Sequence, residues 1–235
     1  MKKNFLFGLI GVGALILSGS VGFAAWTIKN STDSKKDTGL KITADATVND
    51  ENLQLTENEC KWDENSSVKF LPVTKTGLAY SWLSASNALS TEQLTATYTI
   101  AGKGAPASGT VTIDATFEDT TTASTDVKTY NELRSLGTNS ETKTKGIVGE
   151  LPKPIIGSDG TANTGSVNAG TDGSFTASIS VTFSWGAAFG GKNPYEYYNS
   201  KPYKKELATE AKTNIEYLAY LPKCSFKLTV NVTAA

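Results

Sequence analysis

The sequence predicts an all-β protein, an antiparallel two-sheet sandwich of jelly-roll-like form with helical insertions. Two long runs carry this prediction, because residues 175–185 and 224–232 alternate apolar and polar side chains. Alternation at period two over such a length is typical of a strand with one buried face. Helical periodicity, by contrast, is confined to two segments, which are 124–137 and 202–222.

Residues 1–24 have the features of a secretory signal peptide. Two lysines precede an uncharged apolar run, Phe5–Leu17, and small residues follow it, which is the order found in such signals. The alternative is a membrane-spanning helix, which needs about 20 apolar residues, whereas this run is shorter and contains glycine. Gly22 and Ala24 are small enough for signal peptidase, so cleavage is expected between Ala24 and Ala25. We therefore expect a secreted, cell-surface-associated protein that keeps no membrane segment.

Residues 25–37 are expected to form an exposed segment in front of the sandwich domain, 38–235. The segment begins with a short alternating stretch that places Trp26 and Ile28 on one face. A polar and charged linker, Ser31–Asp37, follows and would let this stretch reach away from its own domain. The candidate assembly residues of the stretch are Ala25, Trp26, Thr27, Ile28, Lys29 and Asn30.

Three shorter alternating runs begin the sandwich domain, at 40–46, 94–100 and 111–117. The glycine-containing stretch 101–109 separates the second run from the third. A short stretch of this composition between two strands is typical of a hairpin loop. The sequence therefore predicts that the strands on either side of it are neighbours in one sheet.

A helix is predicted over residues 124–137. Ser124 or Thr125 is the expected N-terminal cap, and Val127, Tyr130 and Leu133 share one face. Gly137 is the expected stop, as glycine commonly follows the last turn of a helix.

The stretch 151–174 is rich in glycine, asparagine, aspartate and threonine, which predicts a surface loop. Asp159, Asn163 and Asp172 offer oxygen ligands of the kind that calcium prefers. Their spacing matches neither an EF-hand nor a repeated calcium-binding nonapeptide. A loop without a metal is the favoured interpretation.

Six aromatic residues lie where the strand 175–185 ends. Exposed aromatic side chains there would stack on sugar rings or bind a partner. The alternative is that they cover the end of the sandwich, since most large aromatics are buried. The residues of this candidate binding loop are Trp185, Phe189, Tyr195, Tyr197, Tyr198 and Tyr203.

A second helix is predicted before the last strand, ending ahead of Pro222. Its apolar stripe consists of Leu207, Ala211, Ile215 and Leu218, which is the spacing of one helix face.

Cys60 and Cys224 are the two cysteines of the chain. In an exported protein an even number of cysteines predicts a disulfide, and one closing so long a loop would contribute on the order of 5 kcal/mol. Two separate thiols are the alternative.

Composition excludes several classes of function. The formal net charge is −1 and no long basic run follows the leader, so neither nucleic acid nor an anionic membrane is an expected partner. The chain has no histidine, and therefore no Ser-His-Asp relay, Cys-His relay or HExxH zinc site. No carboxylate pair stands out in an apolar setting. We expect no enzymatic activity, catalytic residue or cofactor.

The junction GVGALILSGSVGFAAWTIKN, followed by TGLKITAD, resembles the start of the TasA/camelysin family of bacterial matrix-fibre proteins. Ala25-Trp26 fits the family's signal-peptide exit, and Thr38–Ile42 fits its first strand. The resemblance implies a jelly-roll sandwich, export, and polymerisation into extracellular fibres by donor-strand exchange. It implies that Ala25–Asn30 is the donor, with Trp26 and Ile28 as its pocket-filling side chains.

Two hypotheses about function follow. The first is a structural subunit of a surface fibre or biofilm matrix, which binds copies of itself, and possible further matrix components, through its N-terminal segment by strand addition. The second is a monomeric surface-binding module, for carbohydrate or as an adhesin, that acts through the aromatic loop 185–203.

Overall fold

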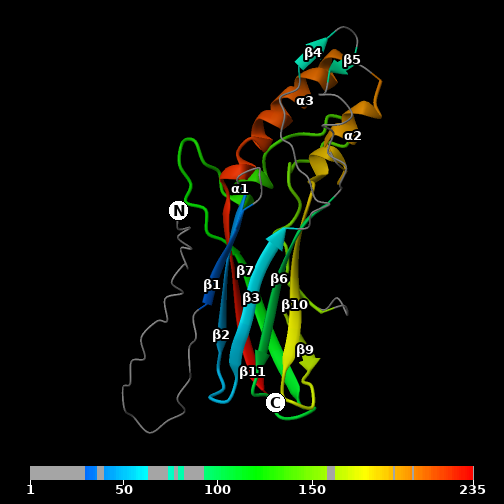
Figure 1. Ribbon diagram of the computed structural model, residues 1–235. Helices are drawn as coiled ribbons and strands as arrows, with labels where there is room; N and C mark the ends of the chain where they lie inside the picture. The colour runs from blue at the N-terminus through cyan, green and yellow to red at the C-terminus, as the bar shows by residue number, and fades with distance from the viewer. Residues whose placement is uncertain are drawn as a thin grey trace, which may run out of the picture.

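A computed structural model describes residues 30–35, 40–62, 74–76, 79–81, 93–157, 162–192, 194–202 and 204–234 of the chain. These residues form two sheets packed face to face, with the helices gathered at one end of the sheets (Figure 1). The predicted all-β class and two-sheet sandwich are therefore confirmed.

One sheet has five strands in the order β1-β2-β11-β7-β9. Its strands are β1 (Asn30–Lys35), β2 (Lys41–Val48), β7 (Thr110–Asp119), β9 (Thr164–Asn168) and β11 (Ser225–Ala234). The other sheet has four strands in the order β3-β6-β10-β8. Its strands are β3 (Gln54–Trp62), β6 (Gln93–Lys103), β8 (Ile155–Ile156) and β10 (Phe175–Ser184). A separate two-stranded sheet pairs β4 (Thr74–Thr76) with β5 (Ala79–Ser81).

The five-stranded sheet is not wholly antiparallel. β2 and β11 pair in parallel, from Ser225 opposite Lys41 to Val232 opposite Val48. The first long strand and the last strand of the chain therefore lie side by side in the middle of this sheet (Figure 1).

The connection from β6 to β7 corrects one prediction. These strands belong to different sheets, so the stretch between them crosses the sandwich instead of closing a hairpin. Gly104 makes the crossing possible: its φ is 92°, and a Cβ there would lie 1.8 Å from the Asn52 carbonyl oxygen. Only glycine accepts both conditions without strain.

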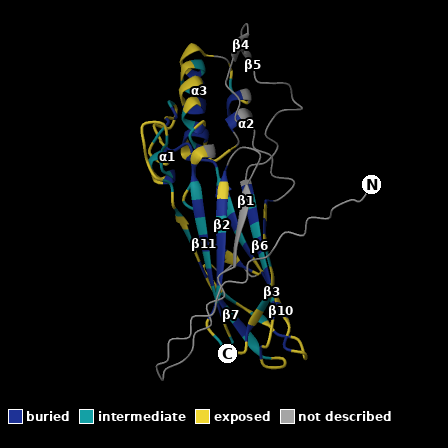
Figure 2. Cartoon of the chain, turned by 60° about the vertical axis from the view of Figure 1, so that its left-hand side comes forward, coloured by how far each residue is buried: buried dark blue, intermediate teal, exposed yellow. Residues whose placement is uncertain are grey.

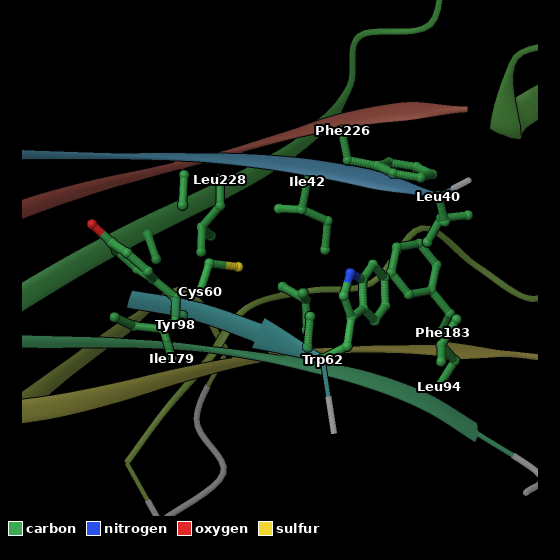
Figure 3. Close-up of a cluster of buried hydrophobic side chains, with 14 of the residues drawn as sticks. Leu40, Ile42, Cys60, Trp62, Leu94, Tyr98, Ile179, Phe183, Phe226 and Leu228 are labelled. Carbon is green, nitrogen blue, oxygen red and sulfur yellow. The ribbon is translucent and has the colours of Figure 1, made fainter. Parts of the chain in front are cut away.

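The core lies between the two sheets, where the alternating apolar residues of both sheets meet (Figure 2). β10 shows the expected pattern, with Phe175, Ala177, Ile179, Val181 and Phe183 all buried. Figure 3 shows the side chains of the two sheets facing each other across this layer. Phe183 of β10 and Phe226 of β11 pack edge to face with their ring centroids 5.0 Å apart, which joins the two sheets near the helical end.

The helices differ from the prediction in two places, at the first predicted helix and in one additional short helix. α3 (Lys205–Leu218) buries the four predicted stripe residues, and a shorter helix, α2 (Pro194–Asn199), precedes it. The predicted helix at 124–137 is reduced to α1 (Tyr130–Leu133). Its cap is Thr129, whose hydroxyl accepts from the Glu132 N–H while the Glu132 carboxylate accepts from the Thr129 N–H. This capping box starts the helix later than the predicted caps would.

The 3-10 turns η2 (Ala187–Phe189) and η3 (Leu221–Lys223) complete the helical end. Across the described ranges, no helix is both long and apolar enough to cross a membrane. The predicted signal peptide, 1–24, lies outside those ranges.

Candidate functional site

The N-terminal segment is described only from Asn30 onward. The cleavage residues Ala24 and Ala25 and the assembly residues Ala25, Trp26, Thr27, Ile28 and Lys29 lie outside the described residues. Asn30 is the first residue of β1. The sequence predicts a linker over Ser31–Asp37, but the structure places Ser31–Lys35 in a strand.

β1 lies at the end of the five-stranded sheet and pairs antiparallel with β2. The pairing runs from Asn30 opposite Ala46 to Lys35 opposite Lys41. The sequence of β1 is NSTDSK, which contains no apolar residue. Because β2 has β11 on its other side, β1 completes the hydrogen bonding of β2.

The inward positions of β2 are buried. Ile42, Ala44, Ala46 and Val48 are each 0 % exposed, as expected for the core face of a strand. The outward positions should be solvated, and Lys41 is exposed while Thr43 and Thr47 are half-buried.

Asp45 is the exception among the outward positions of β2. It is 7 % exposed, and its Oδ2 lies 3.5 Å from the Nζ of Lys227 on β11. Its Oδ1 is buried and has no hydrogen-bond partner. Most buried carboxylate oxygens are hydrogen bonded, so a buried carboxylate oxygen without a hydrogen-bond partner is an unusual feature of β2. The sequence does not single out Asp45, because an acidic residue at an outward strand position is normally solvated.

On the opposite side of the sandwich, backbone hydrogen bonds join the edges of the two sheets. The N–H of Asn163 donates to the carbonyl of Pro154 at 2.8 Å, and the N–H of Ala115 donates to the carbonyl of Asn163 at 2.7 Å. Pro154 leads into β8 of one sheet and Ala115 lies on β7 of the other. The predicted loop 151–174 therefore contains two strands, β8 and β9, that close this side.

On the side where β1 lies, the four-stranded sheet ends in β3. β3 carries Glu57, Glu59 and Lys61 at exposed positions, and the Lys61 Nζ lies 2.7 Å from Glu59 Oε2. Charged side chains on an edge strand oppose unwanted pairing with other chains. β1 has the same share of charged residues as β3, with two among six, and it differs from β3 in being continuous with the predicted assembly segment.

The aromatic loop is mostly a packed cap on the sandwich. Trp185, Phe189, Tyr197 and Tyr198 are all buried. Phe189 meets Trp185 and Tyr198 edge to face, with centroid distances of 6.3 and 6.1 Å. Four of the six candidate side chains are therefore not available to stack on a ligand. The side chains of Tyr195 and Tyr203 lie outside the part of the chain that the structure describes.

Polar groups hold this cap in place. The Tyr198 hydroxyl donates to Glu210 Oε1 at 3.1 Å and accepts from Asn214 Nδ2 at 2.9 Å. Burial is the main cause that raises the pKa of Tyr198. Lys201 contacts the Glu141 carboxylate, and that hydrogen bond is the main cause that lowers the pKa of Glu141. These contacts tie α2, α3 and the loop before β8 together.

The predicted disulfide is not formed. Cys60 and Cys224 are both thiols and both buried. The side chain of Leu228 points toward Cys60 (Figure 3), whereas Cys224 precedes Leu228 by four residues, a rise of about 13 Å along a strand. A disulfide requires Cα atoms within about 7 Å. The Cys224 thiol instead donates to the Lys128 carbonyl at 3.4 Å.

The candidate calcium ligands are not brought together in the described part of the chain. Asp159 lies outside the described residues. Asp172 Oδ1 accepts from the N–H and hydroxyl of Ser174 at 3.0 and 2.6 Å, so this carboxylate serves a local turn. Across the described ranges, no group of three His, Cys, Asp or Glu side chains is placed to hold a metal.

Comparison with known proteins adds no relative to this picture. No protein-family model, curated protein or solved structure matches the chain.

Proposed function

We propose that the chain is a secreted structural subunit of an extracellular fibre or biofilm matrix. In this proposal copies of the chain join by strand addition, with residues 25–30 of one copy completing a sheet of the next. The proposal assigns no catalytic residue and no cofactor.

One observation carries the proposal: the predicted assembly segment leads directly into an edge strand. β1 begins at Asn30 and lies at the end of its sheet. A sheet edge presents N–H and C=O groups that another strand can pair with, and alternate side chains of that strand set its register. Trp26 and Ile28 have the spacing that such a register requires.

The buried aromatic cap weakens the alternative of a carbohydrate-binding or adhesin-like module. A stacking platform needs exposed ring faces, whereas Tyr197 and Tyr198 are 6 % and 0 % exposed. We therefore favour assembly over ligand binding at 185–203.

The proposal is tested by removing residues 25–30 from the mature chain. We expect a folded monomer that forms no fibres, because the strand that links subunits is missing while the sandwich is intact. Electron microscopy and sedimentation over time measure assembly, and circular dichroism measures folding. Replacing Trp26 and Ile28 with serine is expected to have the same effect, and Thr27→Ser is the matched control that should still assemble. Fibres from the deleted chain would rule the proposal out.

A further inference from the structure

Asp45 and Lys227 form an ion pair that differs from the others between described residues. Lys227 Nζ lies 3.5 Å from Asp45 Oδ2, and the Asp45 side chain is 10 % exposed. In the other ion pairs of the described chain, the carboxylate side chains are 43–85 % exposed. Exposed pairs are screened by water and contribute little. The Asp45 carboxylate is instead held beside one amine with little water around it.

The fold keeps these two side chains together. Lys227 lies on β11 directly opposite Thr43 of β2, and Asp45 is two residues farther along β2. Residues two apart on a strand share a face, so both side chains lie on the outer face of the five-stranded sheet. β2 and β11 are adjacent inner strands, each paired on both sides (Figure 1). The two backbones therefore cannot move apart without breaking the sheet.

The ionised carboxylate of Asp45 is incompletely satisfied. Its Oδ1 is buried and accepts no hydrogen bond from any described residue. A buried charged group that lacks a hydrogen-bond partner is destabilising. Condensation with an amine removes one of the two oxygens and the charge, so an amide at this position avoids the cost of burying the carboxylate.

The pair contains every atom that such a condensation needs. Proton transfer from the Lys227 ammonium to the Asp45 carboxylate gives a neutral amine and a carboxylic acid. The Nζ–Cγ bond then forms, the bond from Cγ to the acid hydroxyl breaks, and that hydroxyl leaves as water with a proton from Nζ. No oxidant or cofactor is required. Well-oriented reactants held in contact have an effective concentration of about 10⁵–10⁸ M, which favours the amide over its hydrolysis.

Glu118 is placed to carry the proton that Nζ loses. It lies on β7 directly opposite Lys227, and it is exposed. Directly opposed side chains on antiparallel strands have Cβ atoms about 4.5–5.5 Å apart, so rotation of its side chain brings the carboxylate to the Lys227 amine. In this position Glu118 accepts the proton and passes it to the leaving hydroxyl, as a general acid–base group does.

We propose that Asp45 and Lys227 condense into an intramolecular amide, with Glu118 as the proton carrier. The amide is a covalent cross-link between β2 and β11, which are the first long strand and the last strand of the chain. This inference does not rest on the proposed function, because the cross-link forms within one chain whether or not copies assemble.

Intact-mass spectrometry of the purified chain tests the cross-link. We expect a mass below that of the linear sequence by one water. Lys227→Arg is the matched control, because its guanidinium keeps the positive charge beside Asp45 but does not condense. This variant should have the full linear mass, and circular dichroism checks that it folds. An unmodified chain with the full linear mass would overturn the inference.

Digestion with trypsin locates the bond. Trypsin does not cut after an acylated lysine, so residues 42–61 and 224–235 should remain joined as one branched peptide. The digest is reduced and alkylated, because these two peptides also contain Cys60 and Cys224, which a disulfide would join. A loss of water that persists in Lys227→Arg, or that maps to an Asp-Gly step such as Asp172-Gly173, would contradict the cross-link.

Glu118→Gln tests the proton carrier. The loss of water is followed over time after cell-free synthesis of the chain. We expect Glu118→Gln to slow it about 10²-fold or more, the usual contribution of a general acid–base group. Asp114→Asn is the matched control, since Asp114 is an exposed acid on the same strand, and it should leave the rate unchanged. Condensation of Glu118→Gln at the unmodified rate would exclude Glu118 from this role.

Discussion

At the scale of single residues, burial keeps the Cys224 thiol and the Tyr98 hydroxyl protonated. Cys224 is 1 % exposed, and burial raises the pKa of its thiol to about 12. Burial also raises the pKa of Tyr98 to about 12. Both groups are therefore neutral over the physiological range, and the chain has no histidine to titrate there. Cys224 is poorly suited to thiol exchange, because the thiolate is the reactive form.

These raised pKa values predict alkaline destabilisation. Each group has a higher pKa in the folded chain than in the unfolded chain, where Cys is near 8.5 and Tyr near 10. The folded state is thus fully stabilised below about pH 8.5 and loses stability as pH rises toward 12, by about 1.4 kcal/mol per pH unit for each titrating group. Urea unfolding from pH 7 to 11 measures this slope.

The variant Cys224→Ser separates the contribution of the Cys224 thiol to this pH dependence from the contribution of the tyrosines. The serine hydroxyl can donate to the Lys128 carbonyl as the thiol does, but it does not titrate in this range. We expect the loss of stability between pH 8.5 and 10 to be smaller in the variant and the later loss to remain. An unchanged slope below pH 10 would contradict the role given to Cys224.

At the scale of elements, the side of the sandwich at β8 and β9 depends on one close approach. A Cβ at Gly165 would lie 2.7 Å from Cγ2 of Ile156. β9 belongs to the five-stranded sheet and β8 to the four-stranded sheet, so this contact joins the two sheets at their edges. The absence of a side chain at Gly165 lets Ile156 reach its position, where it is 3 % exposed.

Gly165→Val should therefore destabilise the fold by about 1–3 kcal/mol, the usual cost of overpacking. The added methyl groups would force β8 away from β9. Thermal and urea unfolding measure the change. Ser166→Val is the matched control, since the neighbouring residue is exposed on the same strand. Ile156→Ala should recover part of the loss at Gly165→Val, and a Gly165→Val chain as stable as the control would show that the contact is unimportant.

At the scale of the whole molecule, the two ends of the described chain meet in one sheet. β2 and β11 pair in parallel, and β11 pairs on its other side with β7. Four residues of β11 lie in the core, each at most 1 % exposed: Phe226, Leu228, Val230 and Val232. Contacts between segments so distant in sequence make folding slow and cooperative, and no part of this sheet is expected to be stable without β11.

A chain ending at Lys223 tests this cooperativity. Burying each of the four β11 side chains contributes about 1.5–3 kcal/mol, and together they match the typical stability of a whole domain, about 5–15 kcal/mol. We expect the shortened chain to show no cooperative unfolding transition by circular dichroism. A chain ending at Thr233 is the control, which keeps all four residues and should fold. A cooperative transition in the shorter chain would mean that the remaining strands form a stable unit.

Local periodicity was sufficient to predict the strands of strong apolar alternation and the longest helix. The alternation at 175–185 and 224–232 predicted β10 and β11, and the stripe through Leu207 and Ile215 predicted α3. Each of these signals depends only on which face of one element is buried. β1, β3, β4, β5, β8, β9 and α2 were missed because they are short or largely polar, and the start of α1 was misplaced because the Thr129 capping box was overlooked.

The sequence by itself thus determined the fold class, the faces of the long strands and the position of an apolar run, residues 5–17, ahead of a polar chain. Only the tertiary structure decided which strands are neighbours: it placed β6 and β7 in different sheets, set β2 parallel to β11, and kept the two thiols apart. It also showed that the carboxylate of Asp45 is buried beside the edge strand. Pairing, distance and burial depend on residues far apart in the chain, and local periodicity carries no information about them.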